Sequence, residues 1–346
     1  MTAHTASPTT TAFPAPAAAS DSAPSSNATI APTSPVSAPT GAAAPDASAP
    51  TAPSSATAPG TSTASAPARV GVLGGGRMGA GIAHAFLLAG SHVTVVERDA
   101  DAAQAASVRV LSAVDASIAR GTATSTVQEY RARFATGTDA SAFAACDLVV
   151  EAVPEDARLK VDALTRVEAQ LAPSAALASN TSSISIDELA AALDRPARFL
   201  GMHFFNPVPA STLVEIVRGD ATDAALVTAA SGWVQALGKT PIVVADAPGF
   251  ASSRLGVALG LEAIRMLEDG VASAADIDAA MTLGYKHPVG PLRLTDLVGL
   301  DVRLGIAEYL AAQLGPRFEP PALLRRLVAD GHLGRKTGRG FYEWDD

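Results

Sequence analysis

The stretch RVGVLGGGRMGAGIA at residues 69–83 determines the expected fold. Its apolar run 70–73 predicts a buried β-strand, and the segment 78–89 after it predicts an amphipathic helix. Between them Gly74, Gly76 and Gly79 fit G-x-G-x-x-G, directly after a strand and at the start of a helix, which is the context that gives this motif its meaning. Such a unit is typical of the first turn of a Rossmann-type dinucleotide-binding sheet.

The pattern of strand and helix signals continues along the chain and then changes. Further strands are expected at 92–96, 147–153, 176–179, 199–203, 213–217 and 241–244, and helices at 102–119, 161–170, 186–193 and 224–237. This alternation predicts an α/β domain with a mostly parallel sheet covered by helices. After Pro248 only helices are expected, at 254–269, 274–283, 302–313 and 321–329. We therefore predict a Rossmann-type dinucleotide-binding domain at 69–246 and a smaller all-helical C-terminal domain at 247–346.

The first 68 residues consist almost wholly of Ala, Pro, Ser, Thr and Gly. Because they offer little apolar surface to offset the entropy of ordering, residues 1–68 are expected to form a disordered tail. They contain no Lys or Arg and no continuous apolar segment, which argues against a secretory or mitochondrial targeting signal. The expected location is the cytoplasm, and the single cysteine, Cys146, is consistent with that reducing compartment.

Composition also excludes several classes of partner. The chain has 25 Lys and Arg against 34 Asp and Glu, and no basic stripe that would indicate nucleic-acid binding. The longest apolar helical segment, 255–267, is interrupted by Glu262 and Arg265 and is too short to cross a bilayer, so no membrane partner is expected. No His or Cys spacing typical of a metal site occurs, so no metal is expected.

The glycine loop and the end of the second predicted strand indicate a cofactor site. Gly74 allows a tight turn, Gly76 lets the backbone approach a pyrophosphate, and Gly79 lets helix and strand pack closely. Arg77 and Met78 complete the motif and are counted among the expected cofactor contacts. Glu97 ends the second strand, where a carboxylate can bind the ribose hydroxyls, so NAD is favoured. NADP stays the less favoured alternative, because adjacent Arg98 could reduce the repulsion between Glu97 and a 2′-phosphate.

Polar residues also follow the later strands, where open α/β sheets place their ligands. Ser182 belongs to the cluster SNTSS at 179–183, and His203 ends another predicted strand. Oxidation of an alcohol needs a base for the hydroxyl proton and donors to the oxygen, which His203 and Ser182 could supply. Glu215, inside the apolar run 213–217, could orient the imidazole. A hydrogen-bonded core histidine beside two Phe residues is the simpler alternative for His203.

Over residues 69–346 the sequence resembles the L-3-hydroxyacyl-CoA dehydrogenase family. The resemblance is carried by motifs in a fixed order: GGGRMGAGIA at 74–83, DLVVEA at 147–152, SNTSS at 179–183, HFFNPVP at 203–209, LVEIV at 213–217, PGF at 248–250 and GRKTGRGFY at 334–342. It implies NAD-dependent oxidation of the 3-hydroxyl of an L-3-hydroxyacyl-CoA. The expected substrate is short, such as 3-hydroxybutyryl-CoA, or dicarboxylic, such as 3-hydroxyadipyl-CoA.

The resemblance also implies roles for individual residues. His203 would be the general base, Glu215 its orienting carboxylate, and Ser182 and Asn206 the hydroxyl and amide beside the reacting oxygen and the cofactor. Further cofactor contacts would be made by Glu97, Glu155, Lys160 and Lys336. For Lys160, an ordinary surface position on a helix is the competing interpretation. The resemblance further implies a homodimer through the helical domain, and a face with Gly256 and Gly260 would permit close helix packing there.

One position departs from the family pattern. Ser253 stands where the family usually has an asparagine that helps order the catalytic pocket, and a hydroxyl offers one donor on a shorter arm. We expect activity to survive with an altered pocket geometry or acyl preference. A dicarboxylic substrate would need an unpaired cation in the acyl pocket, and the sequence assigns none. Two other functions are kept open: a dehydrogenase of a sugar acid or carnitine, and a non-catalytic NAD-binding sensor or interaction protein.

Overall fold

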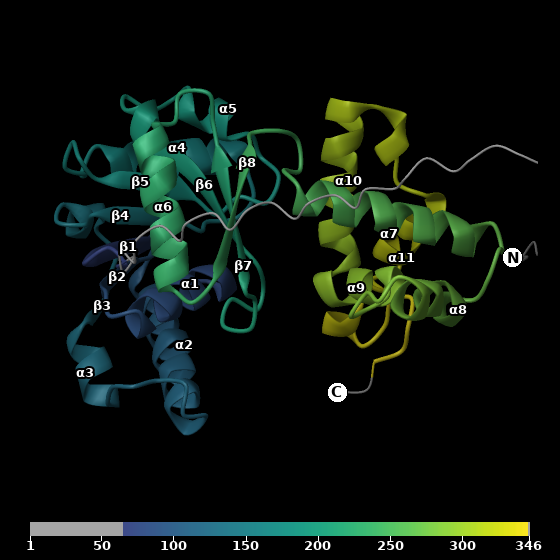
Figure 1. Ribbon diagram of the computed structural model, residues 1–346, viewed down its shortest axis with the longest axis horizontal. Coiled ribbons are helices and arrows are strands. Elements are labelled where there is room, and N and C mark those ends of the chain that lie inside the picture. The colour runs from purple at the N-terminus through teal and green to yellow at the C-terminus, as the bar shows by residue number, and fades with distance from the viewer. Residues whose placement is uncertain (1–64, 345–346) are drawn as a thin grey trace, which may run out of the picture. The chain divides into compact units, whose positions relative to one another are not determined.

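A computed structural model describes residues 65–344, in which eight strands form one sheet (Figure 1). The strands are β1 Arg69–Leu73, β2 His92–Val96, β3 Phe134–Gly137, β4 Leu148–Glu151, β5 Ala176–Ser179, β6 Phe199–Phe204, β7 Leu213–Arg218 and β8 Thr240–Ala245. Their order is β3-β2-β1-β4-β5-β6-β7-β8. All neighbours pair in parallel except β6 and β7, so β7 and β8 run against the other six. The predicted α/β fold with a mostly parallel sheet is confirmed.

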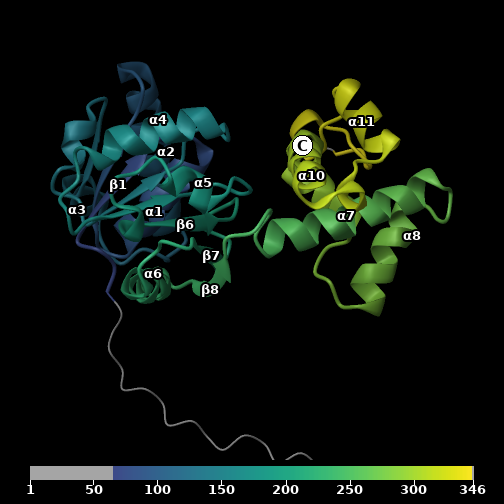
Figure 2. The same cartoon turned by 90° about the horizontal axis from the view of Figure 1, so that it is seen from above.

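Helices cover both faces of this sheet (Figure 2). One face packs against α1 Arg77–Leu88, α2 Ala100–Ala119 and α6 Ala224–Ala236, and the other against α4 Ala157–Glu168 and α5 Ile186–Ala190. Alternate residues of a strand point to opposite faces, so Val72 lies in the first core and neighbouring Leu73 in the second. Burial on both faces explains why the strands read as nearly continuous apolar runs.

The C-terminal part is helical, as expected, and has a core of its own. It contains α7 Ser252–Glu268, α8 Ala274–Ala279, α9 Pro291–Val298, α10 Leu300–Leu314 and α11 Ala322–Ala329. Side chains from α7, α9 and α10 fill the centre of this core, among them Leu261, Leu292 and Leu310. The glycine face of α7 packs within the chain: a Cβ on Gly260 would lie 3.2 Å from Thr295 Oγ1. That face is therefore used by α9 and α10, and not left open for a second subunit.

Some elements differ from the sequence-based expectation. Strand β3 and helices α3 Val127–Ala132 and α9 were not predicted, and the expected helix 274–283 continues beyond α8 as a π-helical turn, Ala280–Gly284. Residues 1–64 of the predicted disordered tail, 1–68, lie outside the described residues. The division between residues 246 and 247 stays a prediction. None of the helices within 65–344 is long and apolar enough to cross a membrane.

Candidate active site

The loop after β1 requires glycine at two of its predicted positions. Gly74 has φ +90°, a backbone conformation that favours glycine. A Cβ on Gly79 would lie only 1.8 Å from the carbonyl oxygen of Gly74. Helix α1 can therefore begin directly against the end of β1, as the motif predicts.

The N-terminus of α1 offers hydrogen-bond donors to an anion. Gly76 is its N-cap, no side chain caps the helix, and no acidic residue lies in the first turn. The first N–H groups of a helix have no intrahelical acceptor and attract phosphate groups. A Cβ on Gly76 would meet no atom within 4 Å, which leaves room for a ligand at the backbone. Exposed Arg77 and half-buried Met78 form the start of the same turn.

Glu97 lies beside this loop. Its Oε1 accepts a hydrogen bond from the Gly75 N–H at 2.7 Å, and its Oε2 accepts one from the Arg98 N–H at 3.2 Å. Arg109 of α2 donates to the Gly75 carbonyl oxygen at 3.2 Å, a brace that the sequence did not reveal. The residues fit a dinucleotide, with a helix N-terminus for the pyrophosphate and a carboxylate for the ribose. Since Glu97 would repel a 2′-phosphate, the arrangement favours NAD.

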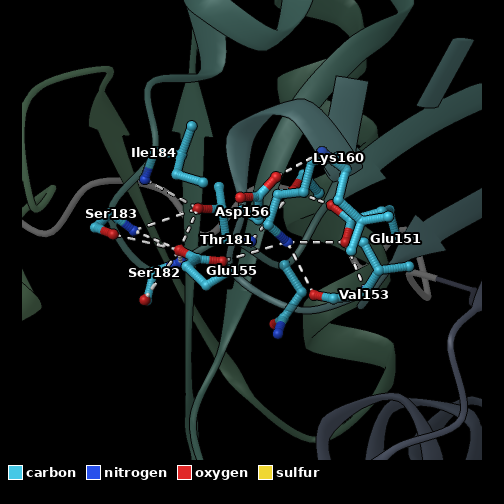
Figure 3. A network of polar contacts seen from close by, with 12 residues as sticks. Glu151, Val153, Glu155, Asp156, Lys160, Thr181, Ser182, Ser183 and Ile184 are labelled. Carbon is cyan, nitrogen blue, oxygen red and sulfur yellow. Dashed lines mark hydrogen bonds and ion pairs between the residues drawn. The ribbon is translucent and has the colours of Figure 1, made fainter. Parts of the chain in front are cut away.

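Lys160 forms ion pairs with two glutamates, of which Glu151 is buried and Glu155 is partly exposed (Figure 3). Its side chain on α4 is 1% exposed, so the interpretation of Lys160 as a surface lysine is wrong. Its Nζ lies 2.8 Å from Glu151 Oε1 and 3.3 Å from Glu155 Oε2. Ser179 donates a further hydrogen bond to Glu151 Oε2. Buried charges need such partners, and Glu151, which ends β4 inside the motif DLVVEA, was missed as a site residue.

Glu155 connects this network to the loop that carries Ser182. Its Oε1 accepts hydrogen bonds from Thr181 Oγ1 at 2.6 Å, from the Ser182 N–H at 2.8 Å and from Ser182 Oγ at 3.2 Å (Figure 3). Burial would raise the pKa of Glu155, but Lys160 and these donors outweigh it, so the pKa is lowered and the carboxyl stays ionised. Glu155 and Lys160 thus position the Ser182 loop. Their predicted contact with the cofactor stays a prediction.

His203 and Glu215 form the pair that the sequence predicted. They are register partners in the antiparallel pair β6–β7, and His203 Nδ1 lies 2.7 Å from Glu215 Oε2. Glu215 has no exposed surface and His203 is almost fully buried. Burial would raise the pKa of Glu215, yet hydrogen bonds from His203 and Ser252 lower it overall. An ionised carboxylate only accepts hydrogen bonds, so Nδ1 carries the proton and Nε2 is left as the basic nitrogen.

The start of α7 completes the surroundings of Glu215. Oε1 accepts the N–H groups of Ala251 at 3.2 Å and Ser252 at 2.9 Å, and Oε2 also accepts the Ser252 hydroxyl. A helix N-terminus stabilises a carboxylate through its free N–H groups and its dipole. Ser252 was not among the predicted site residues, although its neighbour Ser253 was. Within residues 65–344 the Ser253 side chain makes no hydrogen bond. Nothing in the structure therefore explains why a serine replaces the asparagine of the family at this position.

The other predicted residues lie in different surroundings. Asn180, a missed residue of SNTSS, accepts the Phe204 N–H through Oδ1 at 2.9 Å and ties the Ser182 loop to the end of β6. Asn206 follows β6 and is exposed. Lys336 forms an ion pair with Asp301 at 2.6 Å in the helical part. No contact among the described residues brings Lys336 to the glycine loop, so its role as a cofactor contact stays a prediction.

Known proteins match almost all of the described chain. A model of the 3-hydroxyacyl-CoA dehydrogenase NAD-binding domain matches residues 69–247, and a model of the C-terminal domain of the same family matches residues 249–344. These matches confirm the predicted family and the predicted NAD cofactor.

Individual relatives support the same family. A 3-hydroxybutyryl-CoA dehydrogenase of Bradyrhizobium diazoefficiens is 42% identical over 80% of this chain and 95% of its own length. A probable 3-hydroxybutyryl-CoA dehydrogenase of Deinococcus radiodurans is 40% identical over 80% of this chain and all of its own length. The crystal structure of an (S)-3-hydroxybutyryl-CoA dehydrogenase from Ralstonia eutropha superposes with a TM-score of 0.77 at 40% identity, covering 81% of this chain and 100% of that one. The chain therefore belongs to the 3-hydroxyacyl-CoA dehydrogenase family.

Proposed function

We propose that this protein oxidises the 3-hydroxyl group of a short-chain L-3-hydroxyacyl-CoA to the 3-oxo group, reversibly and with NAD. The observation that carries the proposal is the buried contact of 2.7 Å between His203 Nδ1 and Glu215 Oε2. It leaves Nε2 as the basic nitrogen of His203. The same sheet also carries a helix N-terminus and an acidic strand end that suit NAD. The relatives named 3-hydroxybutyryl-CoA dehydrogenases support a short acyl chain.

The geometry of the pair suggests how the proton moves. His203 Nε2 takes the proton of the 3-hydroxyl, and the ring becomes positively charged. Glu215, ionised and 2.7 Å from Nδ1, stabilises that charge and fixes the ring orientation. In the reverse direction the charged His203 returns the proton to the 3-oxygen. NAD, when bound, supplies the acceptor for the hydride that leaves the same carbon.

Ser182 and Asn206 are proposed to lie beside the reacting oxygen and the cofactor. Glu155 supports this role for Ser182, because it holds the loop through the Ser182 N–H at 2.8 Å. Asn206 is exposed and three residues beyond His203, so its amide is free to meet a bound substrate. Donors to the oxygen stabilise the charge that develops there during oxidation.

The decisive experiment measures NAD reduction with a panel of 3-hydroxyacyl-CoA thioesters, and with free 3-hydroxybutyrate, carnitine and a sugar acid as alternatives. We expect turnover of the thioesters only, and its loss in His203→Ala. Oxidation of a free hydroxy acid without any thioester activity would support the sugar acid or carnitine alternative. NAD binding with no turnover of any compound would support a sensor. Either result would refute the proposal.

We also propose a homodimer formed through the helical part. Large apolar side chains that stay exposed are concentrated there, with Leu255 at 71%, Leu283 at 72% and Tyr285 at 75% exposure. Exposed apolar surface of this kind is typical of protein interfaces. Light scattering on the full chain should give twice the monomer mass, and Leu255→Glu should reduce it. A monomer at micromolar concentration would contradict this proposal.

A cytoplasmic location is proposed as well. The chain has one cysteine, Cys146, which is buried, and burial raises its pKa to about 11. A thiol of this kind is inert and the chain needs no oxidising compartment. Cell fractionation with an antibody against the protein tests the location, and recovery outside the cytoplasmic fraction would refute it.

A further inference from the structure

Lys239 is a half-buried cation whose polar partners within residues 65–344 are two backbone carbonyl groups. It lies between α6 and β8, and its Nζ donates hydrogen bonds to the carbonyl oxygens of Val208, at 2.6 Å, and of Ser211. No carboxylate of the described chain forms an ion pair with it. Burial lowers the pKa of Lys239, because the charged form loses contact with water. The chain therefore keeps a partly desolvated charge whose hydrogen bonds serve a single loop.

That loop joins β6 to β7 and carries Asn206. Residues 207–211 form a compact turn, in which the N–H groups of Ala210 and Ser211 both donate to the Pro207 carbonyl oxygen at 3.0 Å. Lys239 binds a carbonyl near the beginning of this turn and one at its end. Val208 follows Asn206 by two residues, which an extended chain spans in at most about 7 Å. The ammonium thus holds the backbone close to the Asn206 side chain.

Helix α1 contacts the same loop. Val208 is 2% exposed and packs in the core between the sheet and α1. A Cβ on Gly81 would lie 2.8 Å from Val208 Cβ, so a glycine is needed for the loop to lie directly against the helix. Gly81 follows the N-cap Gly76 by five residues, about 7.5 Å along the helix axis. The Asn206 loop therefore packs on the helix whose N-terminus suits the pyrophosphate.

The beginning of the loop is anchored as well. Asn180 Oδ1 accepts the Phe204 N–H at 2.9 Å, which fixes the end of β6. Asn206 lies between this anchor and the carbonyls that Lys239 binds. It is exposed, and its side chain makes no hydrogen bond within the described residues. The position of its amide is therefore set by the two anchored ends of the loop.

We propose that Lys239 is a positioning residue, which fixes the turn 207–211 and thereby holds the Asn206 amide where it donates to the reacting 3-oxygen. This role rests on the function proposed above and deepens it, since Lys239 acts through Asn206. A donor stabilises the charge that develops on the oxygen only if its N–H groups already point there. An ammonium suits the task because its three N–H donors can bind two carbonyl groups at once.

The first test replaces Lys239 by methionine, which keeps an unbranched side chain but removes the charge and the donors. A displacement of about 1 Å in a positioning group can lower the rate about a hundred-fold. We expect kcat with 3-hydroxybutyryl-CoA to fall about ten- to a hundred-fold, with a smaller change in KM, because the lost interaction belongs to the transition state. Lys239→Arg retains N–H donors and should recover most of the loss. Arg218→Met, an exposed cation at the end of β7, is the control and should leave kcat unchanged.

The second test asks whether Lys239 acts through Asn206. In an Asn206→Ala background, Lys239→Met should lower kcat no further, because its effect requires the amide. Calorimetry should give a nearly unchanged Kd for NAD in Lys239→Met, which shows that the N-terminus of α1 is intact. Urea unfolding of the same variants separates positioning from stability. A merely structural lysine would lower the free energy of unfolding and leave the two losses in kcat additive.

The outcomes distinguish this role from the proposed function. Unchanged kcat in Lys239→Met, full turnover in Asn206→Ala, or losses that add in the double variant would each overturn the role of Lys239 and leave thioester oxidation intact. No turnover of any thioester by the unmodified protein would refute both. Should Lys239→Met fold poorly, Lys239→Gln takes its place in the same comparisons, because a shorter polar side chain without charge suits the half-exposed position.

Discussion

His203 and Glu215 face each other across the antiparallel junction between β6 and β7, with Nδ1 2.7 Å from Oε2. Register partners in an antiparallel pair lie on the same face of the sheet with their Cβ atoms about 5 Å apart. The backbone pairing of the two strands therefore brings the two side chains within hydrogen-bond distance of each other. Reversal of the strand direction at this point places the base at the end of one strand and its carboxylate near the beginning of the next.

Replacing His203 by alanine should remove the base and leave the fold and cofactor site unchanged. Loss of general acid–base catalysis lowers rates by about 10² to 10⁴. We expect kcat with 3-hydroxybutyryl-CoA to fall by at least the lower figure, while the Kd for NAD measured by calorimetry changes little. His92→Ala, an exposed histidine at the start of β2, is the matched control. Turnover retained in His203→Ala would refute the proton-transfer role.

Glu215→Gln keeps the size of the side chain but removes its charge. The amide cannot stabilise a charged imidazole as a carboxylate does, so kcat should fall while KM changes little. Because the two residues act as one unit, the effects should not add: His203→Ala with Glu215→Gln should be about as slow as His203→Ala alone. Steady-state kinetics of both single variants and the double variant measure this. Additive losses would show that the two residues act independently.

Much of the fold could be predicted, and the exceptions have physical reasons. Buried strands give strong apolar runs, which is why β1, β2, β4, β5, β6 and β7 were found, and the run 241–244 indicated β8. Strand β3 was missed because FATG at 134–137 is short and partly exposed, with a single large apolar residue. The antiparallel pairing of β6 and β7 was not predicted, because an apolar run carries no information about strand direction.

The site was predicted less completely than the fold, since burial of polar groups depends on packing. Lys160 is in phase with Ala163, Leu164 and Val167, which are buried on the same face of α4. This spacing of three, four and seven residues places Lys160 on the buried face of α4 and is the signal in the sequence that indicates its burial. Ser252 could not be found in this way, because its partner Glu215 is distant in sequence and meets it only through the start of α7.

Ser252→Ala should lower the stability of the protein at neutral pH and make that stability less dependent on pH in the acid range. The pKa of Glu215 is lowered in the folded state, so its ionised form stabilises the fold at neutral pH, and this contribution is lost as the pH falls through that lowered value. Removing the hydroxyl brings the pKa closer to its ordinary value, so the ionised carboxylate contributes less stability at neutral pH and less is lost on acidification. At neutral pH we expect about 1.5–3 kcal/mol less stability, the value of a hydrogen bond to a charged group.

Urea unfolding measured across the acid range tests this prediction. The difference between Ser252→Ala and the unmodified protein should shrink as the pH falls, because Glu215 becomes protonated in both. Ser253→Ala is the control. The Ser253 hydroxyl makes no hydrogen bond within the described chain, so its loss should change the free energy of unfolding little at any pH. A difference that stays constant with pH would mean that Ser252 contributes packing and leaves the ionisation of Glu215 unaffected.

Lys160→Met should destabilise the protein strongly, because it leaves Glu151 buried without its cation. Removing one member of a buried ion pair costs about 3–5 kcal/mol. We expect a loss of this size in the free energy of unfolding in urea. Arg158→Met, an exposed position on the same helix, should change it little. Adding Glu151→Gln to Lys160→Met should recover part of the loss, and a double variant less stable than Lys160→Met would contradict the charge argument.

Ser253→Asn restores the residue that the family usually carries and should alter acyl preference more than rate. Helix α7 begins at Ser252, so an amide at position 253 projects from the first turn next to the residue that binds Glu215. Its longer arm and two donors would add a contact to bound thioesters and change their relative kcat/KM. We expect a shift of up to about ten-fold between 3-hydroxybutyryl-CoA and 3-hydroxyhexanoyl-CoA, within the range of one hydrogen bond. A many-fold rise in kcat for every acyl chain would instead show that Ser253 impairs the natural enzyme, because a change in preference moves substrates in different directions.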